Sequence, residues 1–146
     1  MSLGAESAEW AVSYALNAVA AEDWEEALNR WHSARMSYPD LAIAWAGEAS
    51  LLQILKRVPE ADALTRQAIA EFPDSIDIHA QHCSVAAAQG NWLELKRRWS
   101  ELERRFPGSS YVDQKRPEIL QMVRAGTEEA STEALVGLVA QLEAES

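Results

Sequence analysis

Apolar residues recur at every third or fourth position between residues 24 and 36, and charged or amide side chains fill most of the positions between them. This spacing places the apolar side chains along one stripe of an α-helix. The stripe consists of Trp24, Ala27, Leu28, Trp31, Ala34 and Met36. The pattern therefore predicts an amphipathic helix that packs on other elements through one face.

A second kind of segment alternates with the first. The segments at about 8–21, 42–56 and 76–89 are apolar nearly all round. A helix without a broad polar face is expected to be covered on several sides. The chain therefore predicts repeated pairs of an inner apolar helix and an outer amphipathic helix, which bury their apolar surfaces by stacking.

A single 34-residue period runs through these pairs. Aromatic-proline dipeptides occur three times with that spacing. Pairs of alanines are 34 residues apart, and pairs of tryptophans are 68 residues apart, which is twice the period. The matching residues are Tyr38-Pro39, Phe72-Pro73 and Phe106-Pro107; Ala27 and Ala61; Ala34 and Ala68; Trp24 and Trp92; Trp31 and Trp99. Because independent residue types share the period, it predicts a structural repeat.

Local signals place the ends of the outer helices. Asp23 with Glu26, and Asn91 with Glu94, form capping boxes in the sequence. Pro59 suits the first turn of its helix, where no N–H is needed. Each aromatic-proline pair ends a helix, because proline disfavours helical backbone at the residue before it.

The pattern resembles the tetratricopeptide repeat (TPR) over about residues 8–107. Trp45 matches the aromatic of the first helix, the paired alanines match the small residues of the second helix, and Pro39, Pro73 and Pro107 match the terminal prolines. The third unit departs from the family pattern, with Leu95 and Leu102 at alanine positions and His79 at the aromatic position. The resemblance implies an all-α, right-handed stack of three antiparallel helical hairpins, with units at about 8–41, 42–75 and 76–109.

Residues 110–146 are expected to form capping helices that complete a single domain of residues 1–146. Pro117 suggests a break or a restart, so we expect a helix over 117–124, a turn at Gly126 and a last helix near 132–144. The apolar stripe of that last helix is Leu135, Val136, Leu138, Val139 and Leu142.

Charge and composition narrow the function classes. The net charge of −10 argues against nucleic-acid binding. The charge is uneven: −9 over residues 1–95, +4 over 96–124 and −5 over 125–146. An acidic tail near a basic segment and a set of solvated faces both fit this distribution.

The single cysteine, together with the absence of a signal peptide or membrane span from the sequence, leads us to expect a cytoplasmic protein without membrane contact.

Chemical sites are sparse in the sequence. His79, His82 and Cys83 share one helical face and could hold zinc, but they occupy repeat positions used for packing, and no fourth ligand is evident. No nucleophile elbow, phosphate loop or metalloprotease motif occurs. We therefore expect no enzyme activity, no metal and no cofactor.

The inner helices of such a stack line a concave groove. Its candidate residues are small or apolar and uncharged: Val12, Leu16, Val19, Ile43, Ala46, Ser50, Gln53, Ile54, Ala80, Ser84 and Ala87. This surface suits an amphipathic helix, which could come from a partner, from a second copy or from the chain's own residues 132–144. We expect a protein-interaction module. The alternative is an accessory domain of a larger bacterial enzyme, because the Trp-rich outer helices also resemble modules attached to bacterial glycosyltransferases.

Overall fold

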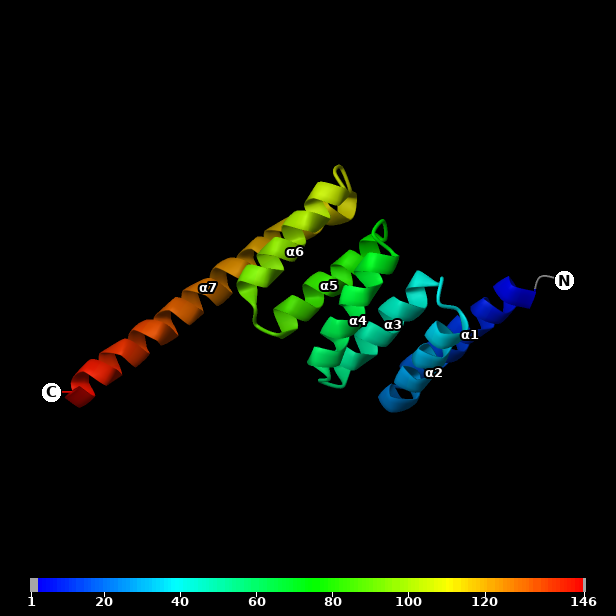
Figure 1. The fold of residues 1–146 in the computed structure, drawn as a ribbon, viewed down its shortest axis with the longest axis horizontal. Helices are drawn as coiled ribbons and strands as arrows, with labels where there is room; N and C mark the ends of the chain where they lie inside the picture. Colours follow the sequence, from blue (N-terminus) through cyan, green and yellow to red (C-terminus); the bar gives the residue numbers. More distant parts are fainter. Residues whose placement is uncertain (1–2, 146) are drawn as a thin grey trace. The chain divides into compact units, whose positions relative to one another are not determined.

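The computed structural model describes residues 3–145, which form seven α-helices and no strand (Figure 1). Within each compact unit, each helix packs against the next one along the chain. Their bounds are α1 Leu3–Ala20, α2 Trp24–Ser37, α3 Ala42–Ile54, α4 Val58–Glu71, α5 Ile76–Ala88, α6 Trp92–Arg105 and α7 Ser110–Glu145. The predicted all-α hairpin repeat is confirmed.

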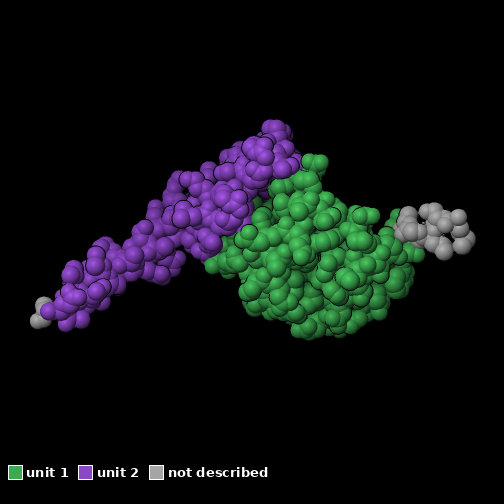
Figure 2. All heavy atoms as spheres, in the orientation of Figure 1, with its two compact units in different colours: residues 1–89 green, residues 90–146 purple. Residues whose placement is uncertain are grey.

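The helices gather into two compact units, residues 1–89 and residues 90–146 (Figure 2). The first unit contains α1–α5 and the second contains α6 and α7. The grouping of residues 1–146 into one domain, with repeat boundaries at 41, 75 and 109, stays a prediction.

The predicted caps begin and end the outer helices. The side chain of Asp23 accepts a hydrogen bond from the backbone of Glu26, and Asn91 accepts one from Glu94. Pro59 lies in the first turn of α4. The outer helices end at their aromatic residues, where the backbone N–H of the C-cap still bonds to the carbonyl four residues earlier; these caps are Tyr38, Phe72 and Phe106.

The turn inside each hairpin repeats with the same period. Glu22, Lys56 and Gly90 occupy equivalent positions of the repeat and all have left-handed backbone, with φ of 57°, 64° and 67°. Only glycine adopts this conformation without a steric penalty. The repeat therefore requires left-handed backbone here even where a side chain opposes it.

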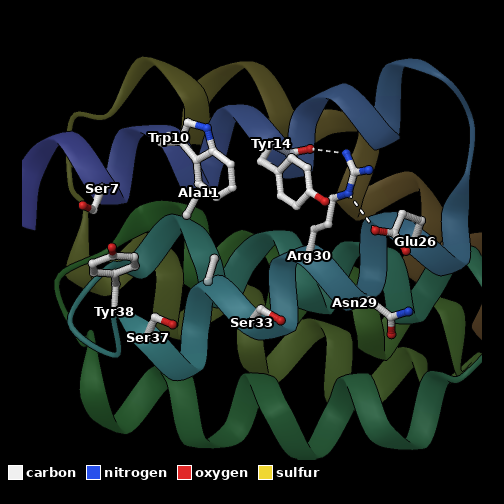
Figure 3. A pocket seen from close by; sticks show the side chains of 11 residues that line it. Ser7, Trp10, Ala11, Tyr14, Glu26, Asn29, Arg30, Ser33, Ser37 and Tyr38 are labelled. Carbon is white, nitrogen blue, oxygen red and sulfur yellow. Dashed lines mark hydrogen bonds and ion pairs between the residues drawn. The ribbon is translucent and has the colours of Figure 1, made fainter.

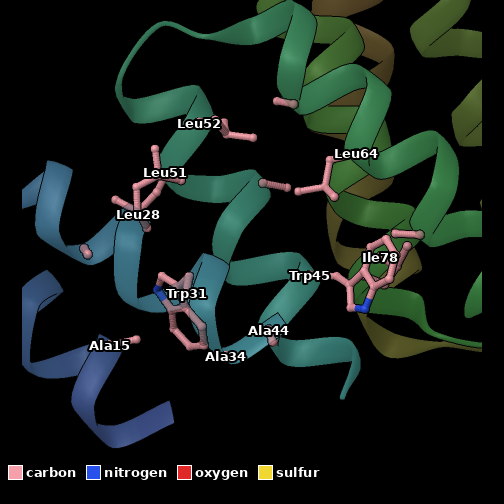
Figure 4. Close-up of a cluster of buried hydrophobic side chains, with 14 of the residues drawn as sticks. Ala15, Leu28, Trp31, Ala34, Ala44, Trp45, Leu51, Leu52, Leu64 and Ile78 are labelled. Atoms are coloured by element: carbon pink, nitrogen blue, oxygen red, sulfur yellow. The ribbon is translucent and has the colours of Figure 1, made fainter. Parts of the chain in front are cut away.

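The core of the first unit lies between the inner and outer helices (Figure 4). Trp31 of α2 is buried beside α3, where a Cβ atom added at Gly47 would overlap its ring. Small residues elsewhere in the cluster, such as Ala15, Ala44 and Ala61, are fully buried and let the helix backbones approach closely. Large side chains on one helix thus pack over small ones on the next, which is how close-packed interiors avoid voids.

A buried ion pair also joins α2 to α3. Glu48 is only 6% exposed, and its carboxylate accepts a hydrogen bond from Arg35 and lies 2.8 Å from Nδ1 of His32. Arg35 also stacks over the Trp45 ring, with its guanidinium carbon 5.0 Å from the ring centroid. Because removing one partner of a buried pair leaves an uncompensated charge, this pair favours one pairing of α2 with α3.

Two successive hairpins share a hydrogen bond made by different side chains. Nε1 of Trp45 donates to the carbonyl of Pro39 at 2.9 Å, and Nε2 of His79 donates to the carbonyl of Pro73 at 2.9 Å. The two donors occupy equivalent positions in successive repeats, and so do the two acceptors. His79 therefore replaces the aromatic residue of the repeat without loss of the contact.

The C-terminal region is one continuous helix, so the predicted turn at Gly126 and the separate helices at 117–124 and 132–144 are wrong. Gly126 is buried inside α7, and a Cβ atom there would overlap the ring of Trp92 on α6. The glycine thus allows close helix packing rather than a turn. Pro117 also lies within α7. A helix tolerates an internal proline by giving up one backbone hydrogen bond.

Candidate partner-binding groove

The eleven predicted groove residues lie on the inner helices α1, α3 and α5 of the first unit, and none of them is buried. Leu16, Ile43 and Ile54 are among the large apolar side chains that are most exposed in this unit, at 49%, 49% and 42%. Val12, Val19, Ala46, Ser50, Gln53, Ala80 and Ala87 are half-buried, and Ser84 is exposed.

The structure joins part of this set directly. α3 packs against α5, and Gln53 on α3 donates to Oε1 of Gln81 at 2.9 Å while accepting from Oγ of Ser84 at 3.0 Å. α1 and α3 both pack against α2. Two of the predicted groove residues, Gln53 and Ser84, are therefore in direct contact. Gln81, which also bonds to Gln53, was not among the residues selected from the sequence.

The surface that these residues form is apolar and neutral. The predicted set contains no charged side chain, and two of its polar side chains, Gln53 on α3 and Ser84 on α5, bond to each other. Such a surface offers buried area to an apolar helix face and offers no cation to an acidic peptide.

His79, His82 and Cys83 take part in packing. His79 and Cys83 are buried, His79 bonds to Pro73, and Nδ1 of His82 lies 3.0 Å from Oγ1 of Thr65 on α4. Within residues 3–145, no group of three or more His, Cys, Asp or Glu side chains is placed to hold a metal ion. The absence of a metal and of a cofactor stays a prediction.

The four arginines of α6 are paired within their own helix. Glu94 accepts hydrogen bonds from Arg97 and Arg98, and Glu101 accepts them from Arg104 and Arg105. These guanidinium donors lower the pKa of both glutamates to about 2. Glu94 and Glu101 thus already partner the arginines of α6, which could otherwise have attracted an acidic tail.

Sequence reasoning missed a cavity of about 640 Å³ between α1 and α2 (Figure 3). The Trp10 and Tyr14 rings stack there with centroids 4.8 Å apart, and Arg30 lies 3.7 Å over the Tyr14 ring. Arg30 also donates to the Tyr14 carbonyl at 2.8 Å and to Glu26 at 2.9 Å. The sequence signal for it was weak: Trp10 and Trp45 are the two tryptophans without another tryptophan 34 or 68 residues away.

This architecture defines a helical-hairpin repeat protein. At the level of sequence, no family model and no curated protein matches the chain. No helix in the described residues combines the length and apolar composition that crossing a bilayer requires.

Solved structures identify the fold as that of TPR domains. The TPR2B domain in the pHsp70 complex of yeast Sti1 aligns with a TM-score of 0.71 at 18% identity, covering 84% of this chain and 97% of that one. The Yersinia enterocolitica type III secretion chaperone SycD, with a peptide of the translocator YopD, aligns at 0.75 and 10% identity, covering 89% and 99%. The first TPR of Spaghetti (RPAP3), bound to the HSP90 peptide SRMEEVD, aligns at 0.68 and 14%, covering 82% and 94%.

Proposed function

We propose that the chain is a non-catalytic protein-interaction module that holds an amphipathic helix or peptide in the groove of α1, α3 and α5. The observation that carries this proposal is the exposure of Leu16, Ile43 and Ile54 on the inner helices, together with the lack of charge among the eleven selected residues. The peptide complexes of the structurally similar SycD and Spaghetti domains, and the pHsp70 complex of the Sti1 domain, support it.

The chemistry of the groove favours an apolar helix over an acidic tail. The peptide bound by Spaghetti contains two consecutive glutamates and a terminal aspartate. The corresponding use here would need Lys or Arg at the groove positions, which hold Val, Leu, Ile, Ala, Ser and Gln instead. Self-association through the groove and occupation by residues 132–144 are the other uses that the same surface supports.

The proposal can be tested by fluorescence anisotropy with a labelled, uncharged amphipathic peptide that carries leucines on one face and glutamines on the other. We expect binding to the full chain, and we expect Leu16→Asp combined with Ile54→Asp to weaken it at least tenfold, because each aspartate must lose water in an apolar site. Helix content, measured by circular dichroism, should be unchanged since both side chains are exposed.

Leu93→Asp is the matched control, because Leu93 is an exposed leucine on α6 outside the groove. The peptide SRMEEVD should not bind. Binding of SRMEEVD together with no binding of the uncharged helix would contradict the proposal. The alternative, an accessory domain of a larger bacterial enzyme such as a glycosyltransferase, stays a prediction that the gene context would test.

A further inference from the structure

The cavity between α1 and α2 is lined by a repeat position that is exposed on α1 but buried on α3 and α5. Trp10, Ala44 and Ile78 occupy equivalent positions in the three repeats, and Ala44 and Ile78 are 0% and 1% exposed. Trp10 at the same position of α1 is 64% exposed. The first hairpin therefore displays a large aromatic side chain at a position that the repeat otherwise encloses.

A second position shows the same contrast. Glu48 on α3 reaches Arg35 on the preceding outer helix α2, and His82 on α5 lies against Thr65 on the preceding outer helix α4. Tyr14, which takes the position of Glu48 in the first repeat, instead stacks on Trp10 over the cavity and is 39% exposed (Figure 3). On α3 and α5, the face that carries these positions thus packs against the preceding outer helix, α2 or α4.

The open face contains both a ridge and a hollow. The ridge is the aromatic pair of Trp10 and Tyr14 on α1, and the hollow is lined on α2 by the small residues Ser33, Ala34 and Ser37 (Figure 3). An interface with two-fold symmetry needs a surface that complements itself, in which a ridge of one copy meets a hollow of the other. Exposed Trp, Tyr and Arg side chains are also the residues that contribute most to protein interfaces.

The charges of the face also permit contact with an identical face. Its lining includes one acidic and one basic side chain, Glu26 and Arg30, which are bonded to each other at 2.9 Å. Two such faces therefore bring no excess of like charge into contact. A basic partner helix would find no unpaired carboxylate among the lining residues.

We infer that the open face of α1 and α2 is a homodimer interface, in which Trp10 of each copy enters the hollow of the other and α2 of each copy covers the partner's α1. This site is distinct from the groove, because Trp10 and Tyr14 do not belong to the groove positions. The inference therefore does not depend on the proposed peptide binding.

Sedimentation equilibrium of the full chain over a range of concentrations tests the inference. We expect the mass to rise from 16.2 kDa towards twice that value as concentration increases. Trp10→Ala removes the ridge, and Ser33→Arg fills the hollow with a charge, so each should raise the dissociation constant at least tenfold. Leu93→Ala, at an exposed leucine of α6, is the matched control and should leave it unchanged.

Salt provides an independent measurement. Residues 1–41 hold seven acidic and two basic side chains, so two first hairpins repel each other at long range. Salt screens this repulsion, so we expect the dimer to become tighter between low and high salt. A dimer that weakens with salt depends on ion pairs and would overturn the inference.

Two other outcomes would also overturn it. A chain that stays monomeric up to the highest measurable concentration has no such interface. A dimer that survives both face variants but is lost in Ile54→Asp associates through the groove. Circular dichroism and thermal melting of each variant test whether it is folded. Because the two variants lie on different helices, the test still holds if one of them misfolds.

Discussion

At the scale of single residues, the left-handed turn at positions 22, 56 and 90 shows the repeat imposing a conformation on unlike side chains. Gly90 adopts it freely, whereas Glu22 and Lys56 adopt it against the contact between Cβ and the following carbonyl oxygen. The three positions have different residues but the same backbone. Sequence alone marked only Gly90 as suited to such a turn.

This difference predicts opposite effects of glycine and alanine at equivalent positions. Gly90→Ala should lower the free energy of unfolding by about 1 kcal/mol, because it introduces a Cβ atom into left-handed backbone. Lys56→Gly should raise it by about 0.5 kcal/mol, since relief of the strain exceeds the extra entropy of the unfolded glycine. Urea unfolding measures both changes. Lys56→Ala is the control and should have little effect; equal losses from all three variants would contradict the explanation.

Polar residues in the core show what residue patterns predict and what they do not. Glu48 lies in the apolar helix α3, and its burial depends on Arg35, thirteen residues earlier on another helix. His79 was assigned to packing from its register, and it donates to Pro73 as Trp45 does to Pro39. A pairing between helices is a tertiary property, so a local pattern cannot specify it.

At the scale of elements, the period and the caps predicted α1–α6 because both depend on neighbours in sequence. α7 was predicted wrongly for a physical reason. A glycine after a helical segment suits a turn, but it equally suits a place where a neighbouring ring needs room. Gly126 serves the second purpose beneath Trp92, and that contact joins two helices that are separated by a turn in the chain.

Two glycines of α7 allow a matched test of this explanation. Gly126→Ala should destabilise the fold by about 1–3 kcal/mol, because the added methyl group meets the Trp92 ring. Gly137→Ala should stabilise it by up to about 1 kcal/mol, because nothing lies within 4 Å and alanine has the higher helix propensity. Thermal unfolding followed by circular dichroism measures both. Stabilisation by Gly126→Ala would mean that α6 and α7 do not pack through this contact.

At the scale of the whole molecule, the net charge of −10 conceals locally balanced ion pairs. The eight basic residues of 96–124 left two interpretations open, an acidic tail nearby and a set of solvated helix faces. Arg97, Arg98, Arg104 and Arg105 instead form pairs one turn away on the same helix. Net charge along the sequence could not show this, because i,i+3 and i,i+4 pairs depend on helical phase.

These pairs make stability depend on pH in a known direction. The pKa of Glu94 is lowered from 4.5 to about 2, chiefly by its hydrogen bond from Arg97. Its contribution is therefore complete above the unfolded pKa of 4.5 and is lost as pH falls towards about 2. Glu94→Gln should lower the free energy of unfolding at pH 7 by about 1 kcal/mol, since partial exposure screens the pair.

Urea unfolding at several pH values tests this prediction. The difference between the native chain and Glu94→Gln should shrink as pH falls from 5 towards 2.5. Glu71→Gln, at an exposed position of α4, is the control and should change stability little at pH 7. A difference that stays constant with pH would show that the lost contact is not an ion pair.

The continuous α7 has a consequence for building with this protein. Residues 128–145 are helical and exposed, and no glycine turn interrupts them. At 1.5 Å per residue, these residues extend the helix axis by about 27 Å. A second protein that begins with a helix could be joined in phase to this end, and the junction would act as a rigid spacer. Changing its length by one residue would rotate the attached protein by about 100° around the axis.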